Sequence, residues 1–195
     1  MGNVRSVAKA FELLQVKTLI SRKSEDIVKA DWLVLPGVGA FADGMNNLKK
    51  FGLIEILSQE VLQKKKPFLG ICLGMQLLAK SSEEFGEHQG LDWLDASVKA
   101  FNFKDRRLKI PHVGWNNIKF KEDCSLFNGI KQNTVFYFVH SYYMDCADKN
   151  LVVATCDYGG EFTAAVQKQN IFATQFHPEK SQIHGLELLQ NFLKS

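Results

Sequence analysis

Apolar residues in the first half of the chain follow two different spacings. Val4, Val7 and Phe11 recur at the interval of a helical turn, which predicts a helix from a cap at Asn3 to about Leu14. Short continuous apolar runs that end at turn residues are typical of buried parallel strands. On these grounds we expect strands at Lys17–Ile20, Trp32–Leu35 and Pro67–Ile71, and helices at Leu53–Lys65 and Leu73–Lys80.

The second half changes to closely spaced strands with short turns between them. Strands are predicted at Ser97–Phe103, Asn117–Phe120, Thr134–Val139, Leu151–Cys156, Thr163–Gln167 and Ile171–Phe176, followed by a helix at about His184–Leu193. The first half thus predicts a parallel sheet with helices on both faces, and the second half an antiparallel extension of it. No linker-like segment interrupts the pattern. We therefore expect one α/β domain over residues 1–195.

Charge and cysteine content exclude several classes of protein. The net charge of +3 is too small to favour nucleic acid or an anionic membrane as a partner. The basic run Lys64–Lys66 is explained as the favourable end of a helix. No apolar run is long enough to cross a bilayer, and no secretory signal or CxxC pair accompanies the four cysteines. A reducing cytoplasm is the expected location.

A candidate nucleophile lies where the Pro67–Ile71 strand meets the next helix. Gly70-Ile71-Cys72-Leu73-Gly74 has the form G-x-C-x-G, and a sharp turn there would push the cysteine out above the sheet. The dipole of the following helix should favour the thiolate, and the backbone N–H of Leu73 could hold an oxyanion. A lone cysteine is most often a buried structural residue. The flanking glycines favour the nucleophile here.

A candidate base follows the last strand, in His177-Pro178-Glu179. A histidine and a carboxylate two residues apart on a rigid turn can face one pocket, with the histidine moving protons and Glu179 orienting the ring. Taken alone, this tripeptide is equally compatible with a surface loop. Its pairing with the cysteine turn predicts a Cys72–His177–Glu179 triad.

A glycine-containing loop after Trp32–Leu35 is the third candidate element. Gly37-Val38-Gly39 would let a backbone N–H approach a ligand, as a second oxyanion donor must. An ordinary tight turn is the simpler alternative, but ligands of open α/β sheets bind at this edge. A dinucleotide site is excluded because Ala42 stands where G-x-G-x-x-G requires its third glycine. Zinc is excluded because no close ligand cluster exists, so we expect no metal or other cofactor.

These motifs together resemble the class I (triad-type) glutamine amidotransferases. Longer segments resemble the glutaminase subunits of imidazole glycerol phosphate synthases: Pro111–Asn116, Tyr137–Tyr142 and Gln175–Ser181. The resemblance covers nearly the whole chain, in order. It implies a flavodoxin-like open mixed sheet and hydrolysis of L-glutamine to glutamate and ammonia.

The resemblance also implies roles beyond the triad and the oxyanion donors. Gln76 and Glu84 would contact the glutamine, while Ser141 and Tyr142 would line its pocket through their backbones, together with Gly37 and Gly39. Trp115 and Asn116 would lie at the interface with a β/α-barrel cyclase subunit. That heterodimer would use the ammonia to make imidazole glycerol phosphate and an aminoimidazole carboxamide ribotide in histidine biosynthesis.

The start of the chain departs from the family pattern. The family begins with a short central strand and an Asp-Tyr-Gly-like turn directly before Met-Gly-Asn, whereas this sequence begins at Met1. We therefore expect the first family strand to be lacking, and a functional protein to carry roughly ten further residues upstream.

Three alternatives for the function remain open at this stage. The chain could be a paralogue that feeds a sugar-amidinating synthase of surface glycans, because acceptor specificity lies in the partner. It could be a non-catalytic partner-binding subunit, against which the intact triad argues. It could also be a hydrolase of peptides or γ-glutamyl compounds, although Gln76 and Pro111–Asn116 favour the amidotransferase.

Overall fold

Three parallel strands form the centre of the main sheet. The computed structural model describes residues 3–103 and 108–195, and in it β1 (Leu33–Gly37), β2 (Phe68–Cys72) and β11 (Ile171–Thr174) lie side by side in the order β1-β2-β11. Gly37 is in register with Cys72 at the end of the β1–β2 pair. Because the three strands are parallel, the segments that follow them meet at one edge of the sheet.

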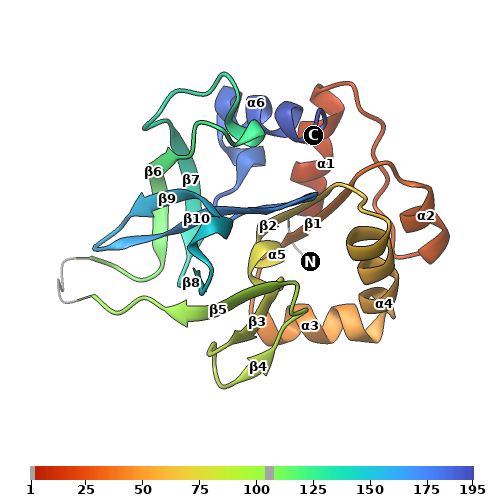
Figure 1. Cartoon of the computed structure of the whole chain (residues 1–195), viewed down its shortest axis with the longest axis horizontal. Helices are drawn as coiled ribbons and strands as arrows, with labels where there is room; N and C mark the ends of the chain where they lie inside the picture. Colours follow the sequence, from red (N-terminus) through yellow and green to blue (C-terminus); the bar gives the residue numbers. More distant parts are fainter. Residues whose placement is uncertain (1–2, 104–107) are drawn as a thin grey trace.

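An antiparallel extension continues this sheet beyond β11. It consists of β10 (Glu161–Lys168), β9 (Val152–Asp157), β6 (His112–Phe120) and β7 (Val135–His140), which complete a seven-stranded order β1-β2-β11-β10-β9-β6-β7. The predicted mixed sheet is thereby confirmed. Strands β6 and β7 stand at the end of the molecule opposite α2, as Figure 1 shows.

A smaller sheet of four strands lies beside the main one. Its order is β4-β3-β5-β8, with β3 at Ala79–Ser82, β4 at His88–Gln89, β5 at Leu94–Ala100 and β8 at Tyr142–Cys146. Strand β8 follows β7 after a single residue, Ser141, so the chain passes directly from the large sheet to the small one. This places the β7–β8 corner near the end of β2.

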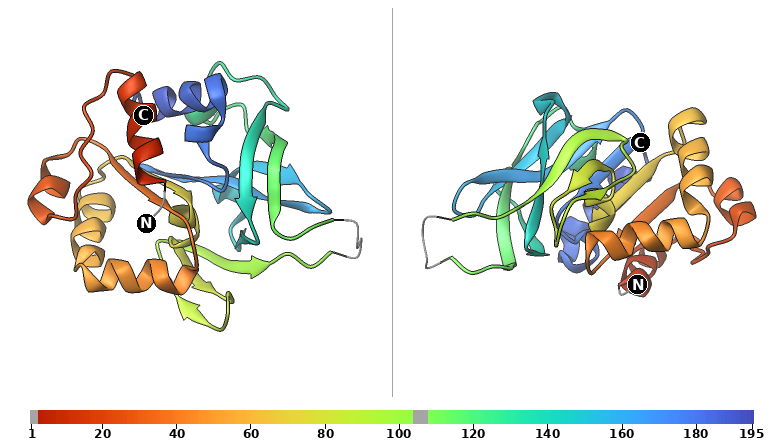
Figure 2. Two further views of the ribbon diagram at one scale, coloured as in Figure 1. Left: turned by 180° about the vertical axis from the view of Figure 1, so that it is seen from behind. Right: turned by 90° about the horizontal axis from the view of Figure 1, so that it is seen from below.

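Helices cover both faces of the parallel centre, as predicted (Figure 2). On one face α1 (Val4–Leu13) and α6 (Gln182–Phe192) pack together through Phe11 and Phe192 and bury Leu69 and Ile71 of β2. On the other face a second core holds Phe68 and side chains of four helices: α2 (Ser24–Lys29), α3 (Phe41–Lys50), α4 (Leu53–Ser58) and α5 (Leu73–Gln76).

Single turns complete the secondary structure. A π-helical turn, Gln59–Gln63, continues α4, and 3-10 turns lie at Ser125–Phe127, Lys149–Leu151 and Pro178–Lys180. The basic run after the π-helical turn makes ion pairs that were not predicted, since Lys64 and Lys66 both pair with the buried carboxylate of Glu60, at 2.6 and 2.9 Å. No helix in residues 3–103 or 108–195 is long and apolar enough to cross a membrane.

Several predicted elements are wrong in place or extent. Lys17–Ile20 is not a strand, because no sheet edge pairs with it, and Leu19 and Ile20 are exposed. The helix predicted at Leu73–Lys80 ends at Gln76, after which the chain turns into β3. The strand predicted at Ser97–Phe103 lies earlier, as β5. Asn3 precedes α1, but its side chain makes no capping hydrogen bond.

Candidate active site

A strained turn presents Cys72 where β2 meets α5. The residue has φ 55° and ψ −111°, a conformation that L-residues adopt only where the surrounding structure enforces it. Its glycine neighbours are required by close backbone contact. A Cβ on Gly74 would lie 1.7 Å from the carbonyl oxygen of Leu35, and one on Gly70 would lie 2.8 Å from the carbonyl oxygen of Gly74. The G-x-C-x-G spacing thus reflects steric limits at this turn.

The surroundings of Cys72 distinguish it from the other cysteines. The side-chain amide of Gln175 donates a hydrogen bond to the Cys72 sulfur at 3.7 Å. By contrast, burial raises the pKa of Cys146 to about 11 and that of Cys156 to about 12, so these thiols stay protonated. Because α5 has only four residues, the helix dipole predicted to favour the thiolate is a minor influence. Gln175 was not expected at this position.

His177 and Glu179 form a buried ion pair above the end of β11. The imidazole Nδ1 lies 2.7 Å from Oε1 of Glu179, and both side chains are almost completely buried. Burial lowers the pKa of His177, but the nearby sulfur of Cys72 and the ion pair with the Glu179 carboxylate outweigh burial and raise the pKa to about 9. The charged imidazolium is therefore the favoured form at neutral pH.

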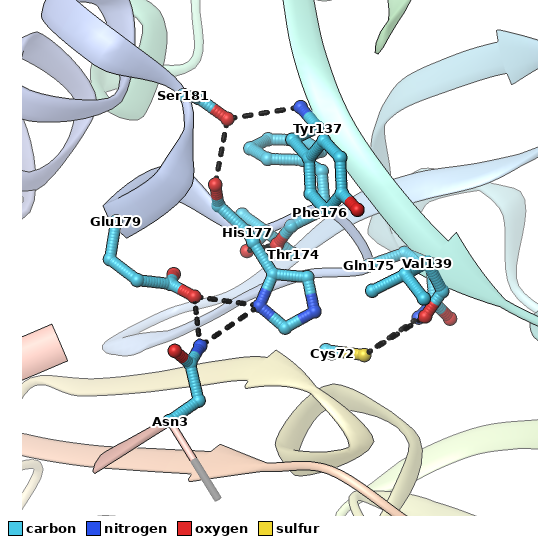
Figure 3. A network of polar contacts seen from close by, with 10 residues as sticks. All are labelled: Asn3, Cys72, Tyr137, Val139, Thr174, Gln175, Phe176, His177, Glu179 and Ser181. Atoms are coloured by element: carbon cyan, nitrogen blue, oxygen red, sulfur yellow. Dashed lines mark hydrogen bonds and ion pairs between the residues drawn. The ribbon is translucent and has the colours of Figure 1, made fainter. Parts of the chain in front are cut away.

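The other nitrogen of His177 is turned toward Cys72. Figure 3 shows the ring between Glu179 on one side and Cys72 on the other. Within the described part of the chain, this Nε2 is buried and has no hydrogen-bond partner that meets ordinary geometric criteria. A buried, unpartnered nitrogen that faces a sulfur can exchange a proton with the sulfur or with a group bound there.

Asn3 is an unpredicted member of this cluster. Its side-chain amide donates to Oε1 of Glu179 and lies 3.3 Å from Nδ1 of His177, as Figure 3 shows. The same carboxylate oxygen therefore accepts from both His177 and Asn3. A second donor restricts the rotation of the carboxylate, so Asn3 helps to hold Glu179 against the imidazole ring.

The predicted oxyanion donors belong to the two segments next to Cys72. Gly37, which ends β1, is in register with Cys72, so Val38 and Gly39 follow directly beside it. Gly39 has φ 100°, a backbone conformation that glycine adopts readily, and a Cβ there would meet no atom within 4 Å. On the other side Leu73 is the first residue of α5, where backbone N–H groups have no intrahelical acceptor.

The residues implied for glutamine binding lie around the same edge. The Gln76 amide donates to the carbonyl oxygen of Tyr142 and to Oε1 of Gln175, both at 2.9 Å. The carboxylate of Glu84 accepts from the backbone N–H of Phe41, at the start of α3, through Oε2. The carbonyl of Ser141 accepts from Phe101 N at 3.4 Å. Of the two backbones expected to line the pocket, those of Ser141 and Tyr142, only that of Tyr142 is hydrogen-bonded to Gln76.

The two residues implied for the partner interface lie on β6. Trp115 is 48% exposed, so it is not a core residue. It packs edge-on against Tyr137, its register partner on β7, while Val113 and Val135 are also exposed on these strands. Asn116 faces inward and donates to the carbonyl oxygen of Asp157 at 3.0 Å.

Two features outside the triad complete the description of the site. Over the residues that the structure describes, no three His, Cys, Asp or Glu side chains gather closely enough to hold a metal ion. His184 also pairs with a carboxylate, that of Glu187 at 3.0 Å, but this pair on α6 is only partly buried. The side chains of Cys72, His177 and Glu179, in contrast, are buried together, an arrangement suited to acyl transfer through a thioester.

Comparisons with known sequences show which proteins this chain resembles. The family model described as Glutamine amidotransferase class-I matches residues 1–195. Imidazole glycerol phosphate synthase subunit HisH 1 of Campylobacter jejuni (strain RM1221) is 50% identical over 193 residues, covering 99% of this chain and 95% of that protein. Subunit HisH 2 of Pseudomonas aeruginosa is 44% identical over 194 residues, with 100% and 95% covered.

The fold also matches solved structures. A crystal structure of a glutamine amidotransferase superposes with a TM-score of 0.76 at 20% sequence identity, over 99% of this chain and 93% of that one. At this level of identity the match concerns the fold alone. It agrees with the predicted mixed sheet flanked by helices.

Proposed function

Since this chain belongs to the class I glutamine amidotransferases, we propose that it is the glutaminase subunit of an imidazole glycerol phosphate synthase. It hydrolyses L-glutamine to glutamate and ammonia and passes the ammonia to a cyclase subunit. The observation that carries the chemistry is the alignment of Glu179, His177 and Cys72, with Nε2 of His177 facing the sulfur. We treat residues 1–195 as one catalytic domain, in keeping with the extent of the family match.

The reaction begins with the thiolate of Cys72 and the imidazolium of His177. The thiolate attacks the side-chain amide carbon of glutamine, and the oxyanion accepts hydrogen bonds from the N–H of Leu73 and an N–H of the Val38–Gly39 segment. His177 gives its Nε2 proton to the amide nitrogen as the C–N bond breaks. Ammonia leaves, and a γ-glutamyl thioester remains on Cys72.

The second half of the reaction restores the enzyme. Neutral His177 takes a proton from a water molecule, whose oxygen attacks the thioester carbon. The carbon–sulfur bond then breaks, glutamate leaves, and the thiolate and imidazolium form again. Glu179 stays ionised throughout and stabilises the charged ring, while Asn3 keeps its carboxylate in place. The hydrogen bond from Gln175 stabilises negative charge on the sulfur.

Glutamine is held beside Cys72 by groups of the same sheet edge. Gly37 and Gly39 line one side, with the backbones of Ser141 and Tyr142 opposite. Glu84 uses only Oε2 in its bond to Phe41 N, so Oε1 can pair with the α-ammonium of the substrate. Gln76 contacts the glutamine through its amide oxygen. This subunit requires no metal, nucleotide or flavin for these steps.

The partner binds on the exposed face of β6 and β7. Trp115 packs edge-on against Tyr137 there and offers the kind of aromatic anchor that dominates interfaces. Tyr137 is also close to the catalytic histidine, since the backbone N–H of His177 donates to the carbonyl oxygen of Tyr137 at 2.9 Å. A partner docked on this face would cover the side from which ammonia leaves. We propose a heterodimer with a β/α-barrel cyclase.

A second candidate function uses the same chemistry with another acceptor. The names of the two relatives are numbered, HisH 1 and HisH 2, and such numbers distinguish copies within one organism. A second copy is free to supply ammonia to a different synthase, such as one that amidinates a sugar. The glutaminase site is the same in both cases, because the partner selects the acceptor.

Transfer of labelled nitrogen tests the proposal. The chain is mixed with a purified cyclase subunit, its phosphoribosyl substrate, glutamine that carries heavy nitrogen in its side-chain amide, and an excess of unlabelled ammonium. We expect the label in the imidazole ring of the product, because the ammonia passes directly between subunits. Glutamine hydrolysis without labelled imidazole in the presence of the cyclase would favour the sugar-amidinating alternative. If glutamine is not hydrolysed even in the presence of the cyclase subunit, the proposed glutaminase activity is wrong.

A further inference from the structure

Two buried histidines outside the triad contact each other. Nδ1 of His112, on β6, lies 3.1 Å from Nε2 of His140, at the end of β7. His112 is 3% exposed and His140 is 6% exposed. Burial lowers the pKa of His112 to about 4 and that of His140 to about 3, so both rings are neutral at physiological pH.

The neighbours of the two rings determine which nitrogens carry protons. Nδ1 of His140 lies 2.8 Å from the carbonyl oxygen of Tyr142, which can only accept, so this nitrogen is the donor. Nε2 of neutral His140 must then accept from Nδ1 of His112. Nε2 of His112 accepts in turn from the side-chain amide of Asn116, at 3.4 Å. Each ring therefore has a single permitted tautomer.

The same contacts continue to the catalytic cysteine. The carbonyl oxygen of Tyr142 accepts from His140 and also from the amide of Gln76. Gln76 donates its second amide hydrogen to Gln175, whose own amide donates to the sulfur of Cys72. A continuous series of hydrogen bonds thus runs from Asn116, next to Trp115, to the nucleophile.

This series determines which end of Gln76 faces the substrate. Both amide hydrogens of Gln76 are used, one on Tyr142 and one on Gln175, so the amide oxygen is the atom left for a ligand. An oxygen there can accept from an N–H or an ammonium group, whereas a flipped amide would offer hydrogens to it. The position of the Tyr142 carbonyl therefore matters for glutamine recognition.

We propose that His112 and His140 are positioning residues for glutamine, which hold the Tyr142 carbonyl and, through it, the amide of Gln76. The proposal rests on the glutaminase function proposed above. It adds that the pair joins the β6 strand of the partner face to the glutamine pocket. A change in β6 on docking, transmitted through Asn116, would reach Gln76 by this route.

Packing alone gives no reason for two histidines here. The pair is surrounded by aromatic rings. His112 stacks on Phe138 and Tyr158, and the ring centroids of His140 and Phe162 are 5.1 Å apart. Apolar side chains of similar size would fill this space without the desolvation of four ring nitrogens. The hydrogen bonds to Asn116, His140 and Tyr142 are what the histidines provide and phenylalanine does not.

Steady-state kinetics of the complex with its synthase partner tests the proposal. His140→Leu removes the donor to Tyr142, whereas His140→Asn keeps a donor at the place of Nδ1. We expect His140→Leu to raise the KM for glutamine about tenfold, the typical effect of one lost hydrogen bond, with a smaller change in kcat. His140→Asn should recover most of the wild-type KM. His112→Phe should resemble His140→Leu, because it leaves Nε2 of His140 without its donor.

Two controls separate positioning from general damage. The alkylation rate of Cys72 by iodoacetamide and the ammonia-dependent activity of the complex should stay at wild-type values in these variants. If KM is unchanged in both His140→Leu and His112→Phe, or if His140→Asn is no better than His140→Leu at equal thermal stability, the proposal is wrong. If one variant does not fold, the other decides. A wild-type complex without glutamine hydrolysis would instead contradict the proposed function.

Discussion

At the scale of single residues, the site depends on a balance of two opposing effects at His177. Burial disfavours a charged imidazole, and by itself it keeps His112 and His140 neutral. At His177 the adjacent carboxylate of Glu179 and the sulfur of Cys72 reverse this outcome. Three buried histidines in one small domain therefore have two different protonation states, each suited to its neighbours.

The raised pKa of His177 predicts a pH dependence of stability. The pKa of His177 is about 9 in the folded protein and 6.5 in the unfolded reference. The folded state is therefore stabilised most at a pH low enough for His177 to be protonated in both the folded and the unfolded chain. This stabilisation is fully present below pH 6.5 and is lost as the pH rises through about 9. Urea denaturation of wild type and His177→Gln should show a stability difference that declines over this window. A difference that grows with pH would contradict the assignment.

Asn3 should affect catalysis through Glu179. Loss of one hydrogen bond to a charged group changes the rate by about tenfold, so Asn3→Ala should lower kcat for glutamine hydrolysis by roughly that factor. Asn3→Asp should be worse, because it places a second carboxylate against Glu179. Ser6→Ala, an exposed change on the same helix, is the matched control. Wild-type kcat in Asn3→Ala would show that Glu179 needs no second donor.

At the scale of elements, the turn between β2 and α5 explains why the nucleophile can be strained. Strand β2 is buried along its whole length, between β1 on one side and β11 on the other. The backbone on both sides of Cys72 is held by these pairings and by α5, so the unfavourable φ of 55° persists. The glycines at positions 70 and 74 allow the strand and helix to approach closely enough.

Two glycine substitutions should separate the strained turn from the oxyanion loop. Gly74→Ala places a Cβ 1.7 Å from the Leu35 carbonyl oxygen, which should cost on the order of 3 kcal/mol of stability or more. Gly39→Ala meets no neighbour, so only its positive φ opposes it, at about 1–2 kcal/mol. We expect Gly74→Ala to lower the melting temperature far more, and Gly39→Ala to lower mainly glutamine hydrolysis. Equal melting temperatures would contradict this steric account.

The elements could be predicted where local pattern and tertiary environment agree. The strands predicted at Trp32–Leu35 and Pro67–Ile71 are apolar runs and lie close to where they were expected, although only the second is buried along its whole length. Helix α3 was missed because its sequence contains Gly44 and two asparagines, which are poor helix formers. The structure accounts for Gly44, since a Cβ there would lie 3.0 Å from a methyl group of Leu77.

The candidate site could be predicted from the sequence only where its residues lie in short local motifs. Cys72, His177 and Glu179 lie in short motifs at strand ends, so their sequence neighbours reveal them. Asn3 contacts Glu179, which lies 176 positions away in the sequence. Gln175 contacts Cys72, which lies 103 positions away. No local pattern marks them, because their positions depend on how α1 and β11 pack against β2.

At the scale of the whole molecule, the active-site edge and the β6–β7 face adjoin each other. The parallel strands β1, β2 and β11 end at the catalytic cluster, and the antiparallel strands carry the sheet onward to the exposed aromatic face (Figure 1). Tyr137 belongs to both, since its ring packs on Trp115 and its backbone accepts from His177 N. A partner bound at this face would therefore contact the support of the catalytic base.

Trp115 should contribute to partner binding and not to folding. Because nearly half of its surface is exposed, Trp115→Ala should change the melting temperature little. A central aromatic anchor typically contributes about 2 kcal/mol, so the Kd for the synthase subunit should rise roughly 30-fold. Ile20→Ala, at another exposed apolar residue, in the segment between α1 and α2, is the control. A large drop in melting temperature with unchanged Kd would assign Trp115 to the fold instead.

The central claim is that Cys72 is the nucleophile that releases ammonia from glutamine. The most direct measurement compares two activities of the Cys72→Ala complex: glutamine-dependent and ammonia-dependent product formation by the synthase partner. We expect the first activity to be abolished and the second to stay at its wild-type rate, because the partner needs only free ammonia. Cys124→Ala, at another buried free cysteine, should retain both. Glutamine-dependent synthesis that persists in Cys72→Ala would show that Cys72 is not the nucleophile.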